Sequence, residues 1–299
     1  MSAVLEHAAG VREPPTVELA AMAATCDGAA PADSAELPRL AFVHVPKTAG
    51  ASITASLQLC YADKTFPAMT TLDYPCFDAA QLQAFRFYKG HAYRHDYERL
   101  PPGTRRFTVL RDPVARTISY VRYYRTLDAN QMADPYMQEA VHLAKTQSAV
   151  EFIYSDSPFV IEHVRLGQVR QFLRAATLQQ IGHRQSLTRE LRRRAIDDFL
   201  SAMDGFDFVL TREALALSFP LMVAQLGLPA RCGLLPQENV SSCTDDFDPA
   251  DVRRAVIDVN CGEFECYDHA RAREMAWLTK ALRTAAPDAE QMYKVAVPA

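Results

Sequence analysis

The feature of this sequence that most constrains its fold is an alternation of short apolar runs with segments of helical periodicity. The runs are rich in β-branched and aromatic residues and fall at residues 40–45, 85–91, 105–111 and 206–211. Runs of this kind are typical of buried strands, and strands that alternate with helices form parallel sheets covered on both faces. The sequence therefore predicts an α/β fold with a mostly parallel central sheet flanked by helices.

One domain accounts for most of the chain. Residues 1–37 are rich in Ala, Pro and Glu, and they are interpreted as a poorly ordered leader with one short helix near "TVELAAMAA". Residues 38–285 form the predicted α/β domain, with additional helices between about 135 and 203 and near 249–258 and 263–284. Residues 286–299 are interpreted as a C-terminal tail.

Charge and composition exclude several classes of protein. The formal net charge is −4, which gives no global basic field for nucleic acid. No apolar run approaches the ~20 residues of a membrane span, and the N-terminus lacks the pattern of a secretory signal. The seven cysteines are odd in number and scattered, which indicates reduced intracellular thiols and a cytoplasmic protein.

A zinc site at Cys261, Cys266 and His269 would need a second pair of ligands nearby, and none is evident. These residues are interpreted as part of a helix with small buried thiols, and no metal is expected.

Ligands of parallel sheets bind beyond the carboxyl ends of the strands. Three polar turns are expected at that edge, at residues 46–52, 90–96 and 111–113. The first, "PKTAGAS", has the composition of an anion site. Gly50 would allow close approach to backbone N–H groups at a helix N-terminus, Lys47 adds a charge, and Thr48 and Ser52 add hydroxyls. An ordinary strand-to-helix turn would explain the glycine but not the lysine with two flanking hydroxyl residues.

The second candidate is "RDPVARTIS", residues 111–119. Asp112 is predicted to cap a helix that begins at Pro113. Arg111 at a strand end and Ser119 two helical turns later are placed to grip one phosphate together. Arg116 is assigned a structural role, with Asp112 as its i, i+4 partner.

Together, "FVHVPKTAGASI" and the later "LRDPVARTIS" resemble the sulfotransferases that use 3′-phosphoadenosine 5′-phosphosulfate (PAPS), most closely the carbohydrate and heparan-type branch and its bacterial relatives. The resemblance covers roughly residues 40–125. It implies the P-loop-like sulfotransferase fold, transfer of a sulfuryl group to a hydroxyl acceptor, and 3′-phosphate binding by Arg111 and Ser119. It also implies that the first motif binds the 5′-phosphosulfate through Lys47, Thr48, Ala49, Gly50, Ala51 and Ser52. The chain departs from the branch at Ala51, where a hydroxyl residue is common.

The resemblance places the catalytic base at the first histidine of "YKGHAYRHD". His91 is therefore the expected general base, with His95 and Asp96 as alternatives, and Lys47 is expected to stabilise the leaving phosphate oxygen. His44 is interpreted as a buried, hydrogen-bonded residue within the first strand.

Several other positions carry weaker expectations. Arg165 and Arg170 lie where the branch often has an arginine-bearing helix, so either is a candidate for a cofactor or substrate contact. The run "LRRR" is interpreted as a solvated helix face. Tyr120, Tyr123 and Tyr124 are assigned to the core or the wall of a cleft.

The acceptor is left open between a small, a lipid-like and a carbohydrate hydroxyl compound. Residues 60–85 and 126–160 are expected to form its walls, and they carry few charges. Two other functions are weighed. A P-loop-like kinase would need G-x-x-x-x-G-K-[ST] and a metal-binding carboxylate, which are not evident. A non-catalytic nucleotide-binding regulatory protein would not need Lys47 and His91 together.

Overall fold

The described part of the chain folds around a single four-stranded, all-parallel sheet. The computed structural model describes residues 37–66, 77–184, 186–236 and 248–285. The sheet has the order β2-β1-β3-β4. Its strands are β1 (Leu40–Val43), β2 (Phe87–Gly90), β3 (Arg105–Leu110) and β4 (Phe208–Thr211). The prediction of an α/β fold with a parallel sheet flanked by helices is confirmed, and each predicted run contains one strand.

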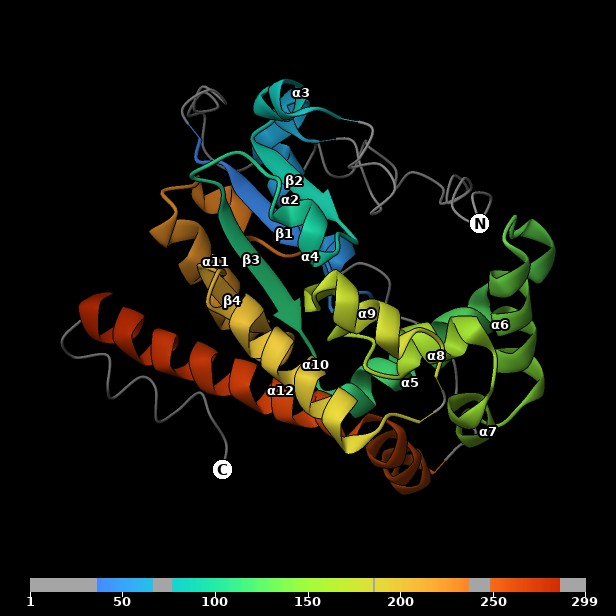
Figure 1. Ribbon diagram of the computed structural model, residues 1–299. Helices are drawn as coiled ribbons and strands as arrows, with labels where there is room; N and C mark the ends of the chain where they lie inside the picture. Colours follow the sequence, from blue (N-terminus) through green and yellow to red (C-terminus); the bar gives the residue numbers. More distant parts are fainter. Residues whose placement is uncertain (1–36, 67–76, 185, 237–247, 286–299) are drawn as a thin grey trace.

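Helices occupy most of the remaining described chain (Figure 1). The α-helices are α2 (Gly50–Tyr61), α3 (Ala79–Gln83), α4 (Arg94–Tyr97), α5 (Pro113–Thr126), α6 (Pro135–Thr146), α7 (Ala149–Tyr154), α8 (Pro158–Val164), α9 (Ala175–Ile181), α10 (Arg189–Met203), α11 (Leu215–Gln225) and α12 (Pro249–Ala285). Short 3-10 helices are η1 (Ala62–Lys64), η3 (Ala129–Gln131), η4 (Arg170–Phe172) and η5 (Ala230–Gly233). Helix α12 is broken by a kink at Asn260, which corresponds to the gap between the two predicted helices.

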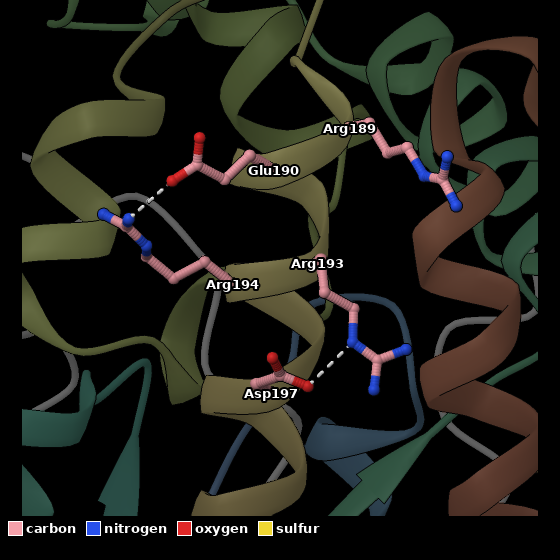
Figure 2. Close-up of a pocket in the computed structure, with 5 residues that line it drawn as sticks. All are labelled: Arg189, Glu190, Arg193, Arg194 and Asp197. Atoms are coloured by element: carbon pink, nitrogen blue, oxygen red, sulfur yellow. Dashed lines mark hydrogen bonds and ion pairs between the residues drawn. The ribbon is translucent and has the colours of Figure 1, made fainter.

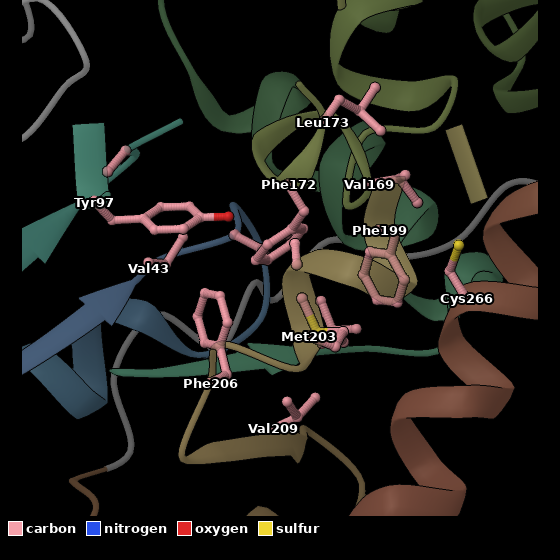
Figure 3. Close-up of a cluster of buried hydrophobic side chains, with 14 of the residues drawn as sticks. Val43, Tyr97, Val169, Phe172, Leu173, Phe199, Met203, Phe206, Val209 and Cys266 are labelled. Atoms are coloured by element: carbon pink, nitrogen blue, oxygen red, sulfur yellow. The ribbon is translucent and has the colours of Figure 1, made fainter. Parts of the chain in front are cut away.

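The sheet has a hydrophobic cluster on each face, because alternate strand residues point to opposite sides. Ala41, Val43 and Val209 pack with Phe199 and Met203 of α10 on one face (Figure 3). On the other face, the strand residues Leu40, Phe42, Phe107 and Phe208 pack with Ile53 and Leu57 of α2 and Phe219 and Met222 of α11. A third cluster joins α5, α6, α7 and α8 to the first part of α12.

The parallel register brings the ends of the strands together. Val43 pairs with Gly90 on one side and with Thr108 on the other, and Leu110 pairs with Thr211. The turns after β1, β2 and β3 therefore lie at one edge of the sheet, as predicted. Figure 1 shows the strand arrows pointing toward the group of helices α5 to α9.

A disulfide joins Cys60, at the end of α2, to Cys232 in η5, with the two Cα atoms 6.4 Å apart. The expectation of reduced thiols is therefore wrong for this pair. The Ser56 hydroxyl also contacts the carbonyl oxygens of Cys232 and Leu234, at 2.8 and 2.7 Å. The second half of α2 is thus held against η5 and the residue that follows it. Cys266 is a buried free thiol.

Several predicted segments lie outside the residues that the structure describes. These are the predicted leader, apart from Leu37, the predicted tail, and part of the first predicted acceptor wall. Within the described ranges, no helix has the length and apolar character needed to cross a membrane.

Candidate anion-binding and proton-transfer site

The turn between β1 and α2 contains two non-glycine residues in the left-handed region. Lys47 has φ 69° and Ala49 has φ 83°. Left-handed residues cost about 1–3 kcal/mol when they are not glycine, and such strain collects at functional sites. Turns built this way aim backbone N–H groups at a common point and form anion-binding concavities. The turn leads directly into the N-terminus of α2, which adds the positive end of a helix dipole.

The hydroxyls of this turn differ in what they can bind. Thr48 is fully buried, and its hydroxyl donates to the Val45 carbonyl oxygen at 2.7 Å. Because a hydroxyl has one proton, Thr48 can meet an anion only through its backbone N–H. Ser52 is half-buried in the first turn of α2, and Ala51 beside it is exposed. Ser52 is therefore the one predicted hydroxyl of the first motif whose proton is not committed within the turn.

Gly50 is required for a different reason from the one expected. Its φ is not positive, and it is the first residue of α2. A Cβ atom at this position would lie 1.8 Å from Nε2 of the His44 imidazole. The glycine therefore makes room for His44.

Lys47 and Arg111 bring two positive charges together. The Arg111 Nη1 group donates to the Lys47 carbonyl oxygen at 3.2 Å, and the Lys47 Nζ atom lies 3.9 Å from the centroid of the Tyr123 ring. Burial, together with the Arg111 charge, lowers the pKa of Lys47 to about 8. Burial also lowers the pKa of Arg111. Within the described chain neither residue forms a salt bridge with a carboxylate, so both positive charges are left without a direct counter-ion.

Arg111 is held by its backbone. It follows β3, its N–H donates to the Gln168 side-chain oxygen at 2.8 Å, and the Gln168 amide group donates back to the Arg111 carbonyl at 2.8 Å. Asp112 caps α5 by accepting from the Ala115 N–H, as predicted. Ser119 lies two turns into that helix, is half-buried and makes no hydrogen bond through its hydroxyl to the described residues. Gln168 was not identified from the sequence, although it lies in the segment singled out for its arginines.

His91 is held as the neutral tautomer that a base needs. Its Nδ1–H donates to the His44 carbonyl oxygen at 2.9 Å, which leaves Nε2 with a free lone pair. Burial lowers the pKa of His91, although the hydrogen bond to His44 acts to raise it. The Gln171 side-chain N–H group donates to the same His44 oxygen at 3.1 Å. The imidazole is therefore neutral near pH 7 and fixed in orientation.

The two alternative bases have other surroundings. Asp96 is fully buried and accepts from the backbone N–H of Tyr93, at 2.8 Å, as part of the capping of α4. His95 is exposed on α4 beside Asp96, with 3.3 Å between its Nε2 and the carboxylate. A buried capping carboxylate has no access to a substrate proton, so the geometry favours His91. His44 itself follows β1 and is half-buried, not inside the strand as expected.

The two further arginines serve the fold. Arg170 is 4% exposed and donates to the carbonyl oxygens of Arg165 and Gly182 at 3.2 and 2.9 Å. Arg165 is 7% exposed and donates to the carbonyls of Tyr154 and Ser155. These contacts hold backbone segments between α7 and α9. Neither guanidinium joins Lys47 and Arg111.

A surface depression on α10 is lined only by residues of that helix (Figure 2). Arg194 pairs with Glu190 at 3.1 Å and Arg193 pairs with Asp197 at 3.0 Å, both at i, i+4 spacing. Exposed pairs of this kind contribute at most about 1 kcal/mol to stability. The interpretation of "LRRR" as a solvated helix face fits this arrangement, and none of the strand-end residues lies here.

The described residues contain no group of three or more His, Cys, Asp or Glu side chains placed to hold a metal ion. The side chain of Cys261 lies outside what the structure describes. Comparison of the sequence with family models gives no match, and comparison with curated proteins gives none either.

Proposed function

We propose that the protein transfers a sulfuryl group from PAPS to a hydroxyl acceptor. The observation that carries the proposal is that the Arg111 guanidinium donates to the Lys47 carbonyl, that its charge acts on the Lys47 ammonium group, and that neither side chain pairs with a carboxylate in the described chain. Both residues lie at the same edge of the sheet as the N-terminus of α2 and the neutral His91. A nucleotide with phosphates at both its 5′ and 3′ positions matches two adjacent anion sites. This donor would supply the sulfuryl group.

The first anion site would hold the 5′-phosphosulfate. Its groups are the backbone N–H groups of residues 48–52, the Ser52 hydroxyl and the Lys47 ammonium group. The second site would hold the 3′-phosphate through Arg111 and the Ser119 hydroxyl, which has no other partner in the described chain. The Arg111 guanidinium donates a hydrogen bond to the Lys47 carbonyl oxygen, so the two proposed anion sites would lie next to each other.

His91 would act as the general base. Its Nε2 lone pair accepts the proton of the acceptor hydroxyl, and the resulting imidazolium keeps its Nδ1–H bond to the His44 carbonyl. The Lys47 ammonium neutralises charge on the oxygen that leaves with the nucleotide. The acceptor oxygen forms its bond to sulfur as the bond between sulfur and that leaving oxygen breaks, and no metal ion is required for this balance of charge.

The acceptor is proposed to be a small, lipid-like or carbohydrate hydroxyl compound. Tyr93 lies two residues after His91, and its hydroxyl donates to the Glu162 carboxylate at 3.0 Å. Beside it, the rings of Phe159 and His163 stack at 4.0 Å. Of these residues only Phe159 belongs to the predicted acceptor walls. Together they would offer aromatic faces and a carboxylate to an acceptor near His91, which suits an uncharged acceptor better than a polyanionic one.

The disulfide bears on the cellular compartment that we propose for the protein. A cytoplasmic location was expected partly from reduced cysteines, whereas structural disulfides such as Cys60–Cys232 persist in oxidising compartments. An oxidising compartment is therefore the better proposal.

The test separates binding from chemistry at His91. His91→Ala should lower single-turnover sulfuryl transfer from PAPS to a panel of hydroxyl acceptors by about 10²–10⁴-fold, the usual contribution of a positioned base. The affinity for the product 3′-phosphoadenosine 5′-phosphate (PAP) should stay close to that of the wild type. Lys47→Ala should reduce both, because its charge meets the nucleotide before and during transfer. Near-full turnover of His91→Ala would remove the base from the proposal.

A further inference from the structure

Four aromatic rings form a continuous stack from the interior of the sheet to His91. The ring centroids of Phe107 and Phe42 are 4.7 Å apart, those of Phe42 and His44 are 5.2 Å apart, and those of His44 and His91 are 4.5 Å apart. Phe107 and Phe42 lie on the adjacent strands β3 and β1 and are at most 1% exposed. The stack thus connects His91 to buried residues of two adjacent central strands.

The third ring of this stack also contacts the anion-binding turn. The His44 imidazole occupies the space where a side chain at position 50 would begin, with three of its ring atoms within 2.2 Å of an added Cβ. Gly50 is the first residue of α2, whose N-terminal N–H groups face the proposed anion. Because the φ of Gly50 is not positive, the His44 ring, and not backbone strain, excludes a side chain here.

The backbone of His44 makes a second connection to the base. Its N–H donates to the Gly90 carbonyl at 2.9 Å, and its own carbonyl accepts from His91 and from Gln171. One residue therefore touches the turn through its ring and His91 through both its ring and its carbonyl.

We propose that His44 is a positioning residue that couples the anion-binding turn to His91, so that the N-terminus of α2 and the orientation of the base shift together. The inference rests on the proposed function in taking His91 as the base and the N-terminus of α2 as the anion site. Lys47 and Lys89 are the charged groups that face His44, and His163, with Glu162 beside it, faces His91. Burial lowers the pKa of both His44 and His91, so two neutral rings stack without charge repulsion near pH 7.

The first experiment is a double-mutant cycle on positions 44 and 50. Gly50→Ala alone should weaken PAP binding about 10-fold or more, because its methyl group displaces the His44 ring and with it the turn. His44→Ala removes that ring, so the double variant should bind PAP better and melt higher than Gly50→Ala. Turnover should stay low in the double variant, because His91 has lost its support.

Matched controls are Gly205→Ala, where an added Cβ meets its nearest neighbour at 3.4 Å, and His142→Ala on the exposed face of α6. Both should behave like the wild type. If Gly50→Ala does not fold, recovery of folding in the double variant is itself the expected rescue. A double variant no better than Gly50→Ala, in folding or in PAP affinity, overturns the inference.

The second experiment measures the coupling between the anion-binding turn and His91 by NMR, and it needs no sulfuryl transfer. In protein labelled with ¹³C-histidine, the His91 ring signal, assigned by its loss in His91→Gln, should shift when inorganic pyrophosphate or PAP is added. The shift should be absent or much smaller in His44→Ala. Equal shifts in both proteins would overturn the coupling. A protein that binds neither anion would contradict the proposed function, whereas the rescue in melting temperature would still decide the role of His44.

Discussion

Arg111 and Arg116 are five residues apart in one segment, and the structure gives them opposite surroundings. Arg116 is 1% exposed, and its Nε lies 3.3 Å from a carboxylate oxygen of Glu263, which is equally buried. Its other nitrogens donate to the carbonyls of His163 and Val164. Arg111 is half-exposed, donates to the Lys47 carbonyl and lies beside another cation. A buried arginine with a carboxylate stabilises the fold, whereas a half-exposed arginine that faces a lysine favours an anion.

The carboxylates near Arg111 explain this difference. Asp112 accepts from the N–H of Ala115 at the start of α5. Glu213 accepts from the N–H of Asp112 and from the Tyr267 hydroxyl, at 3.1 and 2.8 Å. The negative charges of Asp112 and Glu213 act to raise the pKa of Arg111, but neither carboxylate forms a salt bridge with its guanidinium group. The expected pairing of Arg116 with Asp112 is wrong, because Asp112 caps the helix and Glu263 of α12 takes that role.

The largest expected effect is on the structural arginine. Arg116→Ala should lower the free energy of unfolding by about 3–5 kcal/mol, because it leaves the Glu263 carboxylate buried without its partner. Urea denaturation measures this loss, and Arg193→Ala on the exposed face of α10 is the control, expected within about 0.5 kcal/mol of the wild type. If Arg116→Ala lowered the free energy of unfolding as little as the control does, the structural role that distinguishes Arg116 from Arg111 would be contradicted.

The next effect concerns the disulfide that fastens the helix behind the anion site. Replacing Cys60 and Cys232 together with alanine should lower the free energy of unfolding by about 2–4 kcal/mol. Reductant should destabilise the wild type by a similar amount and leave the double variant unchanged. An identical melting temperature of the wild type with and without reductant would show that the bond contributes nothing to stability.

Arg111→Ala should show the reverse pattern from Arg116→Ala. Its melting temperature should stay near that of the wild type, while PAP binding should weaken by about 1.5–3 kcal/mol, the contribution of a charge-assisted hydrogen bond. Adenosine 5′-phosphosulfate, which lacks the 3′-phosphate, should lose much less. Equal weakening of both ligands in calorimetry would mean that Arg111 does not hold the 3′-phosphate.

The smallest effect is a pH dependence from Lys47. Its pKa of about 8 means that the ammonium form predominates below pH 8 and is lost as the pH rises further. Because only the ammonium form attracts an anion, PAP affinity should be constant between pH 6.5 and 7.5 and decline through pH 8 to 9. Lys47→Met should bind PAP more weakly and lose this decline. A flat wild-type profile up to pH 9 would show that Lys47 is not the titrating contact.

Local patterns in the sequence predicted the framework of the site. The apolar runs located all four strands, and Asp112 followed by Pro113 marked the start of α5, because capping and helix-start preferences act over a few residues. The parallel sheet then placed Lys47, His91 and Arg111 at one edge.

Contacts between distant residues were not predictable in this way. Cys60 and Cys232 are 172 positions apart, and the sequence contains no signal that pairs them. The partner of Arg116 lies 147 positions away, and the ring stack joins residues of β1 and β3 to the residues that follow β1 and β2. Gly50 begins α2 within the predicted turn segment, and the reason that a glycine is needed there is the position of the His44 ring, which only the packed structure defines.

The central claim is that Lys47 and Arg111 form a site for a nucleotide with 5′ and 3′ phosphates. Isothermal titration calorimetry of the wild type with PAP, and separately with ATP and Mg²⁺, tests it most directly. We expect PAP to bind at least about 10-fold more tightly than ATP with Mg²⁺, because only PAP places one phosphate on Arg111 while the other contacts Lys47. Preferential binding of ATP with Mg²⁺ would contradict it.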